Sequence, residues 1–108
     1  MFTIRGIELE FDSFDANSVG KYEEALKKVQ KTELVLKQDI SLKTKIINSC
    51  KIIFSAIDDI FGEGIAVKMF GKDTYNIREA SGVWNEIVTE ITRQSSEETA
   101  LFLENINQ

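Results

Sequence analysis

The sequence contains no histidine and no proline, and it has one cysteine among its 108 residues. Without histidine, the chain cannot form a serine–histidine or cysteine–histidine nucleophile pair or bind a metal through imidazole. Cys50 alone can make neither an internal disulfide nor a structural zinc site, and such sparse cysteine usage is typical of a reducing compartment. Because the sequence has no proline, no residue of this type interrupts a helix. We therefore expect a protein that is not an enzyme and that has no catalytic, metal or cofactor site.

Long apolar runs are also missing. No stretch approaches the roughly 20 apolar residues that a membrane-spanning helix requires. Residues 1–5 lack the charged-then-apolar layout of a signal peptide. These features predict a cytoplasmic protein with no membrane partner. The hydrophobic content of 43% is ordinary for a globular protein, and the length predicts a single domain over residues 1–108.

Charge is distributed unevenly along the chain. Residues 1–20 carry a net charge of −3, residues 21–51 carry +4 and residues 52–108 carry −6, which together make the net −5. An acidic protein binds nucleic acid poorly in a non-specific way, so we expect no nucleic-acid partner. The basic middle could attract an acidic partner or the acidic C-terminal half, but we favour the simpler explanation of a solvated helix face.

Residues 2–11 have the alternation of β structure. Apolar and polar residues alternate on both sides of Gly6, and the phase of the alternation changes at that glycine. The pattern predicts either a tight hairpin or a bulged single strand. Because two strands are marginally stable alone, their apolar face must pack on helices or on another chain.

Residues 18–61 carry the strongest periodicity. Apolar residues recur at alternating intervals of three and four, from Val19 through Leu36 and Ile40 to Phe61. This repeat permits one long helix or two helices over 18–37 and 41–61. We favour two helices, since Asp39 and Ser41 can cap a new start and helices beyond about 25 residues are uncommon in small domains.

The rest of the chain predicts three further helical segments. Two glycines at 62 and 64 precede a short helix over 65–70, with Val67 and Phe70 facing inward. A capping-box pattern begins a main helix over 76–94. A second such pattern at Ser95 predicts a break and a separate helical tail over 96–107. The predicted fold class is mainly α (α+β), with the hairpin or bulged strand packed on a small bundle of about four helices.

Three features could be interpreted as chemistry. Asp58, Asp59 and Glu63 lie close together in the sequence, but their spacing matches no calcium loop, so we expect a helix end and a turn. Cys50 occupies an inward position and is predicted to be a buried thiol. Trp84 lies on the apolar face of the last helix and is predicted to belong to the core.

Two blocks of sequence resemble a known family. The N-terminal block runs from Ile7 through Phe14-Asp15-Ala16 to Lys21-Tyr22-Glu23-Glu24-Ala25-Leu26, and the second block is Phe54-x-x-Ile57-Asp58-Asp59-Ile60-Phe61-Gly62-Glu63-Gly64 followed by Met69-Phe70-Gly71. Together they resemble small proteins encoded among the tail genes of phages and prophages of Gram-positive bacteria, between the genes for the tail tube and the tape-measure protein. The resemblance spans roughly residues 6–94.

The resemblance implies a tail assembly chaperone in the cytoplasm of a bacterial host. Its partners would be phage tail proteins such as the tape-measure protein, whose apolar helical segments must be kept soluble until the tube forms. Two alternatives stay open, namely a structural tail component retained in the particle and a small regulatory adapter. A homo-oligomer also stays open. The amphipathic C-terminal tail supplies the candidate protein-binding residues Leu101, Leu103 and Ile106.

Overall fold

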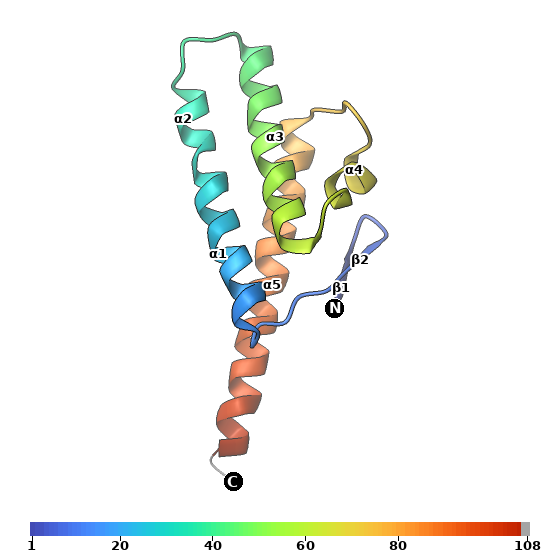
Figure 1. Cartoon of the computed structure of the whole chain (residues 1–108), viewed down its shortest axis with the longest axis vertical. Helices are drawn as coiled ribbons and strands as arrows, with labels where there is room; N and C mark the ends of the chain where they lie inside the picture. The colour runs from blue at the N-terminus through green and yellow to red at the C-terminus, as the bar shows by residue number, and fades with distance from the viewer. Residues whose placement is uncertain (107–108) are drawn as a thin grey trace.

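The computed structural model describes residues 1–106, apart from the side chains of residues 98, 102, 105 and 106. Two short strands are followed by five helices, and the molecule is elongated, with extents of 59 × 28 × 20 Å (Figure 1). The predicted fold class is confirmed: a mostly helical protein carries an N-terminal hairpin packed against the helices. No helix in the described part of the chain combines the length and apolar character needed to cross a membrane.

The hairpin pairs β1 (Phe2–Ile4) with β2 (Ile7–Leu9) in antiparallel register, with Ile4 opposite Ile7. The two residues of its loop both have positive φ, 52° at Arg5 and 76° at Gly6. A two-residue loop of this kind matches the twist of the strands and returns the apolar side chains to one face. That face packs on α3 and α5 and buries Ile4 and Leu9 almost completely.

Helix α1 (Ala16–Gln30) begins two residues before the predicted start, because Asp15 rather than a later residue caps it. The Asp15 carboxylate accepts hydrogen bonds from the backbone N–H and the hydroxyl of Ser18, at 3.0 and 2.9 Å. The hydrogen bond from the Ser18 hydroxyl has the largest effect on the pKa of Asp15, and the bond from the Ser18 N–H group has the next largest. Both lower this pKa below its ordinary value.

The predicted helix over 18–37 is interrupted once. Helix α1 ends at Gln30, and α2 (Thr32–Leu36) resumes after Lys31, which keeps right-handed helical angles. The hydroxyl of Thr32 donates to the carbonyl of Val29 at 2.8 Å, so the backbone tightens here without reversing. The chain reverses over 37–41, where the sequence favoured a break, and α3 (Leu42–Phe61) returns alongside α1 and α2.

The core face near this turn differs from the predicted one. The three-and-four repeat placed Leu36 inward, but Leu36 is 60% exposed and Val35 is buried instead. The interruption at Lys31 rotates α2 by part of a turn, and this rotation moves the repeat out of phase with the core.

Helix α4 (Ile65–Phe70) has the predicted bounds. Phe70 is buried as predicted, and its ring stacks on Phe54 with the centroids 4.7 Å apart. Val67 is 56% exposed, so its predicted inward orientation is wrong. Ala66 and Met69 face the core in its place, because so short a helix buries one narrow face.

Helix α5 (Ile77–Ile106) is continuous over 30 residues, so the predicted break at Ser95 is wrong. The Ser95 hydroxyl donates to the hydroxyl of Ser13 at 3.1 Å instead of capping a new helix. Nothing in the local sequence forces an end here, since neither glycine nor proline occurs between 83 and 106. The predicted tail over 96–107 is thus a continuation of α5 up to residue 106, and residue 107 lies outside the described residues.

Candidate protein-binding surfaces

The C-terminal part of α5 projects beyond the body of the molecule (Figure 1). We call residues 96–106 the stalk. Ser13 contacts the helix just before it, through hydrogen bonds with Gln94 at 3.4 Å and with Ser95 at 3.1 Å. Every described side chain of the stalk is exposed. No other element shields it in the described part of the chain, so its apolar groups face solvent.

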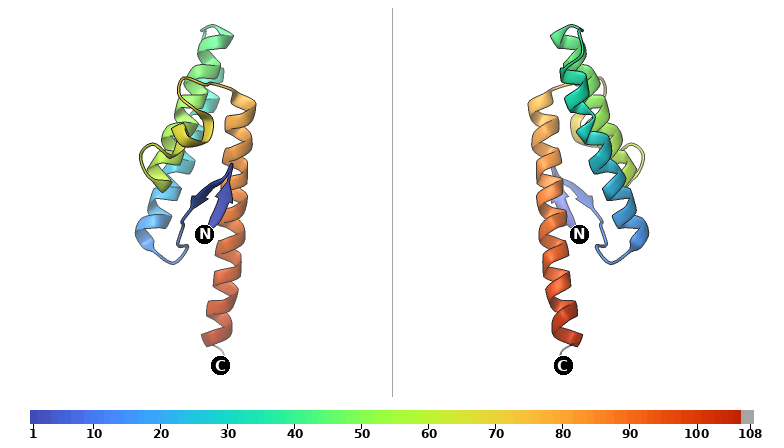
Figure 2. Two further views of the ribbon diagram at one scale, coloured as in Figure 1. Left: turned by 90° about the vertical axis from the view of Figure 1, so that its right-hand side faces the viewer. Right: turned by 90° about the vertical axis from the view of Figure 1, so that its left-hand side faces the viewer.

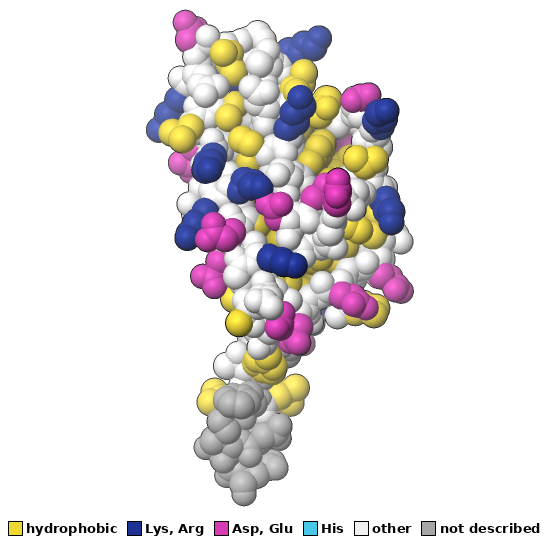
Figure 3. All heavy atoms as spheres, viewed as in Figure 1, with side chains coloured by type: hydrophobic (Ala, Val, Ile, Leu, Met, Phe, Trp, Pro, Cys, Tyr) yellow, Lys and Arg dark blue, Asp and Glu magenta, His cyan; other side chains and the backbone are white. Residues whose placement is uncertain are grey.

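The predicted binding residues Leu101 and Leu103 lie on this stalk and are 59% and 53% exposed. They do not form one face, because residues separated by two positions on an α-helix point in directions about 200° apart. Figure 3 accordingly shows hydrophobic atoms on both sides of the stalk. The side chain of Ile106 lies outside those that the structure describes. Leu103 lines a shallow depression of about 440 Å³ together with Ser95, Ser96, Thr99 and Ala100.

The opposite end of the molecule exposes a second set of apolar side chains. We call residues 34–47 the tip. Its exposed apolar residues are 37–71% accessible, and they are Leu34, Leu36, Ile40 and Leu42. A depression of about 510 Å³ opens beside them, lined by Leu42, Lys43, Ile46, Ile47, Asp73 and Tyr75. Several basic side chains (dark blue) lie around this upper part of the molecule on the face shown in Figure 3.

Sequence reasoning missed the tip as a surface. The three-and-four repeat assigned Leu36 and Ile40 to the core, and it left Leu34 and Leu42 without a role. The sequence did contain a signal for this surface. Leu34 and Leu42 fall outside the repeat and lie near a predicted turn, where little core is available to bury them.

A groove runs between α2 and α5. It has a volume of about 360 Å³, and most of its lining is apolar, including Leu36, Ile77 and Trp84. Ser49 of α3 also lines it. The Ser49 side chain is 2% exposed, and its hydroxyl has no hydrogen-bond partner among the described residues. A buried hydroxyl without a partner is costly, so this groove contains an unused polar group.

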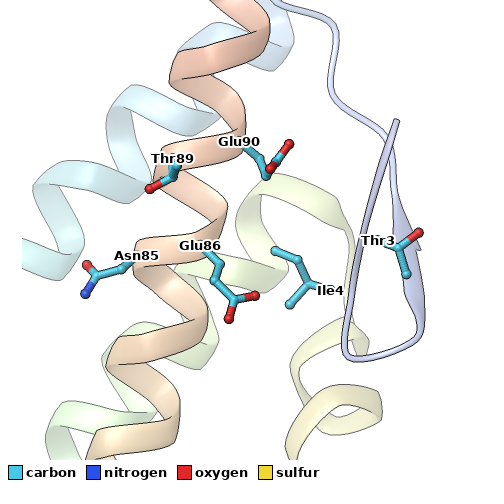
Figure 4. A pocket seen from close by; sticks show the side chains of 6 residues that line it. All are labelled: Thr3, Ile4, Asn85, Glu86, Thr89 and Glu90. Atoms are coloured by element: carbon cyan, nitrogen blue, oxygen red, sulfur yellow. The ribbon is translucent and has the colours of Figure 1, made fainter.

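A further depression separates the hairpin from α5 (Figure 4). Its volume is about 390 Å³, and it is lined by Thr3, Ile4, Asn85, Glu86, Thr89 and Glu90. The Ile4 side chain points from the hairpin toward α5, and the Thr3 side chain points away from α5. Glu90 forms an ion pair with Arg93 at 2.6 Å, so one of the two glutamates beside this depression is already held by a basic side chain on the same helix.

The acidic residues near the end of α3 bond to the backbone of the following turn and to a lysine of another helix. The Asp58 carboxylate accepts hydrogen bonds from the N–H groups of Gly64 and Ala66, at 3.3 and 2.9 Å. Asp59 forms an ion pair with Lys28 of α1. Within residues 1–106, excluding the undescribed side chains, no group of three or more acidic or cysteine residues is placed to hold a metal ion.

The two remaining candidates belong to the core. Cys50 is completely buried, and this burial raises the pKa of its thiol, which keeps it protonated and unreactive. Trp84 is 7% exposed and packs in the main cluster of apolar side chains. Both predictions of burial are confirmed.

A comparison with known protein families places the chain. A model of a family of unknown function, DUF6673, matches residues 5–107. This protein belongs to the DUF6673 family. No curated protein and no solved structure matches it. As a DUF6673 member the protein matches the family over nearly its whole length, including the hairpin turn, all five helices and the whole stalk. The family description assigns no activity, so the surfaces themselves must carry any functional argument.

Proposed function

We propose that this protein is a phage or prophage tail assembly protein that acts as a chaperone in the cytoplasm of the bacterial host and is not an enzyme. In this role it binds an apolar helical segment of a tape-measure or other tail protein and then leaves. The resemblance of residues 6–94 to tail-gene products supplies the setting.

The observation that carries the proposal is the exposed stalk. A thin helix with Leu101 and Leu103 on different sides can pair with a partner helix on either side. Single exposed leucines are common, but two on a projecting helix with no shielding element indicate a surface for a partner. The acidic residues Glu97 and Glu104 keep the stalk soluble and favour basic segments of a partner.

A pull-down from cells that express the neighbouring tail genes tests the proposal. The stalk variant carries Leu101→Ser, Leu103→Ser and Ile106→Ser. A leucine buried in an interface contributes about 1.5–3 kcal/mol, so loss of each contact should weaken binding at least about tenfold. The matched control is Val67→Ser, because Val67 is equally exposed but lies on α4.

We expect the wild-type protein and the Val67→Ser control to recover a tail protein and the stalk variant to lose it, with unchanged helical circular dichroism. Equal recovery by the stalk variant would remove the stalk from the function. Many copies of the protein in purified mature tails would contradict a transient chaperone and favour a retained structural component.

A further inference from the structure

The depression of about 510 Å³ at the tip combines an apolar lining with lysines, and we call it the tip groove. Leu42, Ile46 and Ile47 line it from the first turns of α3, and Tyr75 lines it from the loop between α4 and α5. Figure 2 (left) shows this loop crossing the upper half of α3. Leu42 is 71% exposed, so a large apolar side chain faces solvent beside the tip groove.

Both sides of the tip groove are fixed by contacts within the chain. On one side, the Ser41 hydroxyl accepts from the N–H of Thr44 at 3.2 Å and caps α3. On the other side, the Tyr75 ring stacks against Phe54 with the centroids 6.2 Å apart. The ammonium of Lys51 lies over the same tyrosine ring, 5.9 Å from its centroid. The tip groove is therefore preformed, which lowers the entropic cost of filling it.

Positive charge gathers around the tip groove. Lys43 lines it, and Lys51 lies over its tyrosine. Lys72 directly precedes Asp73, the one acidic residue of the lining. Within the part of the chain that the structure describes, none of these three lysines forms an ion pair. Unpaired cations beside an apolar surface complement a partner that carries carboxylates next to its apolar side chains.

The spacing of residues along α3 suits a helical partner. Leu42 and Ile46 lie one turn apart and form an apolar row. Lys43 and Ile47 form a second row beside it, in which a charge and an apolar group alternate. A helix with leucine-like side chains at every third or fourth position, and carboxylates beside them, can match both rows.

The acidic residue in the lining argues against two other negatively charged partners. Anionic membranes and nucleic acids present continuous negative charge, which Asp73 would repel. A protein helix can place an uncharged residue opposite this carboxylate and keep its own carboxylates for the lysines. The apolar lining also offers nothing to a phosphate backbone.

We propose that the tip groove binds an acidic amphipathic helix of a partner protein. The partner's apolar side chains pack against Leu42, Ile46 and Tyr75, and its carboxylates pair with Lys43 and Lys51. This second binding site goes beyond the proposed function, which rests on the stalk at the other end of a molecule 59 Å long. The two ends select segments of opposite charge, because the stalk carries glutamates and the tip groove carries lysines.

Titration of a labelled peptide into the purified protein gives the first test. The probe is a fluorescein-labelled peptide of about 18 residues, long enough to form a helix, with leucine at every third or fourth position and glutamate beside the leucines. The control peptide has lysine in place of each glutamate. We expect fluorescence anisotropy to show at least about tenfold tighter binding of the acidic peptide, and this binding should weaken as salt is added. Equal binding of both peptides, or binding of neither, would overturn the proposal.

Removal of one apolar side chain tests the location. Leu42→Ser should weaken binding of the acidic peptide about tenfold, because it deletes the most exposed apolar contact of the tip groove. Val67→Ser is the matched control, since Val67 is also exposed but lies on α4. It should bind like the wild-type protein. Equal affinities in the two variants would remove the tip groove as the binding site.

Reversal of charge tests the lysines. The double variant Lys43→Glu, Lys51→Glu should prefer the basic peptide, with helical circular dichroism unchanged. Lys21→Glu, Lys27→Glu makes the same change in net charge at two exposed lysines of α1 and should still prefer the acidic peptide. A reversed preference in both double variants would mean that net charge attracts the peptide and that the tip groove does not select it.

Two other occupants are separated by the same variant. Flotation with phosphatidylglycerol vesicles tests an anionic membrane, and sedimentation velocity tests a second copy of the chain. We expect the wild-type protein neither to float nor to self-associate through the tip. Flotation or self-association that Leu42→Ser abolishes would assign the tip groove to that occupant and contradict the proposal.

The stalk variant separates the tip groove from the proposed function. It should bind the acidic peptide as tightly as the wild-type protein, and Leu42→Ser should still recover a tail protein through the stalk. Loss of peptide binding in the stalk variant would place the peptide on the stalk and overturn the second site. A wild-type protein that binds the acidic peptide but recovers no tail protein would overturn the chaperone role and support the tip groove alone.

Discussion

The carboxylate of Asp58, near the end of α3, accepts a hydrogen bond of 2.9 Å from the backbone N–H of Ala66, in the first turn of α4. The same carboxylate also accepts from Gly64 at 3.3 Å. One side chain therefore joins two helices across a glycine-rich turn. This arrangement explains a conspicuous acidic cluster without a metal ion.

Replacement of Asp58 should separate its role from that of its neighbour. Asp58→Ala is expected to lower the free energy of unfolding by about 2 kcal/mol, since two N–H groups lose a charged acceptor. Asp59→Ala should cost about 0.5 kcal/mol, because Asp59 forms only a surface ion pair with Lys28. Urea denaturation measures both values. Equal costs for the two variants would show that Asp58 does not hold the turn.

The cap of α3 gives a second prediction. The Ser41 hydroxyl accepts from the backbone N–H of Thr44 at 3.2 Å and fixes the point at which the chain enters α3. Ser41→Ala should destabilise the protein by about 1 kcal/mol in the same assay. Ser41→Asp keeps an acceptor at this position and should retain stability. A loss of equal size in both variants would indicate that capping is not the cause.

The hairpin turn gives a third prediction. Gly6 has a φ of +76°, a conformation in which an L side chain is strained even though no atom would clash with an added Cβ. Gly6→Ala should cost about 1 kcal/mol. Gly20→Ala is the matched control, because Gly20 lies inside α1 with ordinary helical angles and open space around it, and alanine there should stabilise by about 0.5–1 kcal/mol. Opposite signs in thermal unfolding are the expected outcome.

The buried thiol gives a fourth prediction. Cys50 should react with a thiol reagent at least about a hundredfold more slowly in the native protein than in denaturant. The difference should persist as the pH rises through the range where ordinary cysteines ionise, because burial raises the pKa of the folded thiol and the reactive thiolate forms only at higher pH. Rapid labelling of the native protein would contradict the burial.

Local rules predicted the elements better than the surfaces. The alternation around Gly6 and the cap at Ser41 act over a few residues, and the hairpin and the start of α3 follow from them. The orientation of Leu36 depends on a slight rotation of α2, which no repeat encodes. Ser95 carries a capping pattern, but its hydroxyl contacts Ser13, 82 residues away in the sequence.

The candidate site was predicted in part. The apolar tail drew attention to Leu101 and Leu103, and both are exposed. Helical geometry alone separates them by about 200°, so they cannot act as one patch. The tip was not predicted, because it becomes a surface only when the packing of α2 and α3 leaves its apolar side chains open.

The contacts of the N-terminal segment have a consequence for biosynthesis. Arg5 forms an ion pair with Glu79 at 3.7 Å, and Ser13 bonds to Ser95. At a translation rate of about 5–20 residues per second, the hairpin is synthesised several seconds before the helix that covers its apolar face. A ribosome-stalled chain that ends before α5 should therefore leave the hairpin open to protease, and the segment made early can become protected only after the late one has emerged.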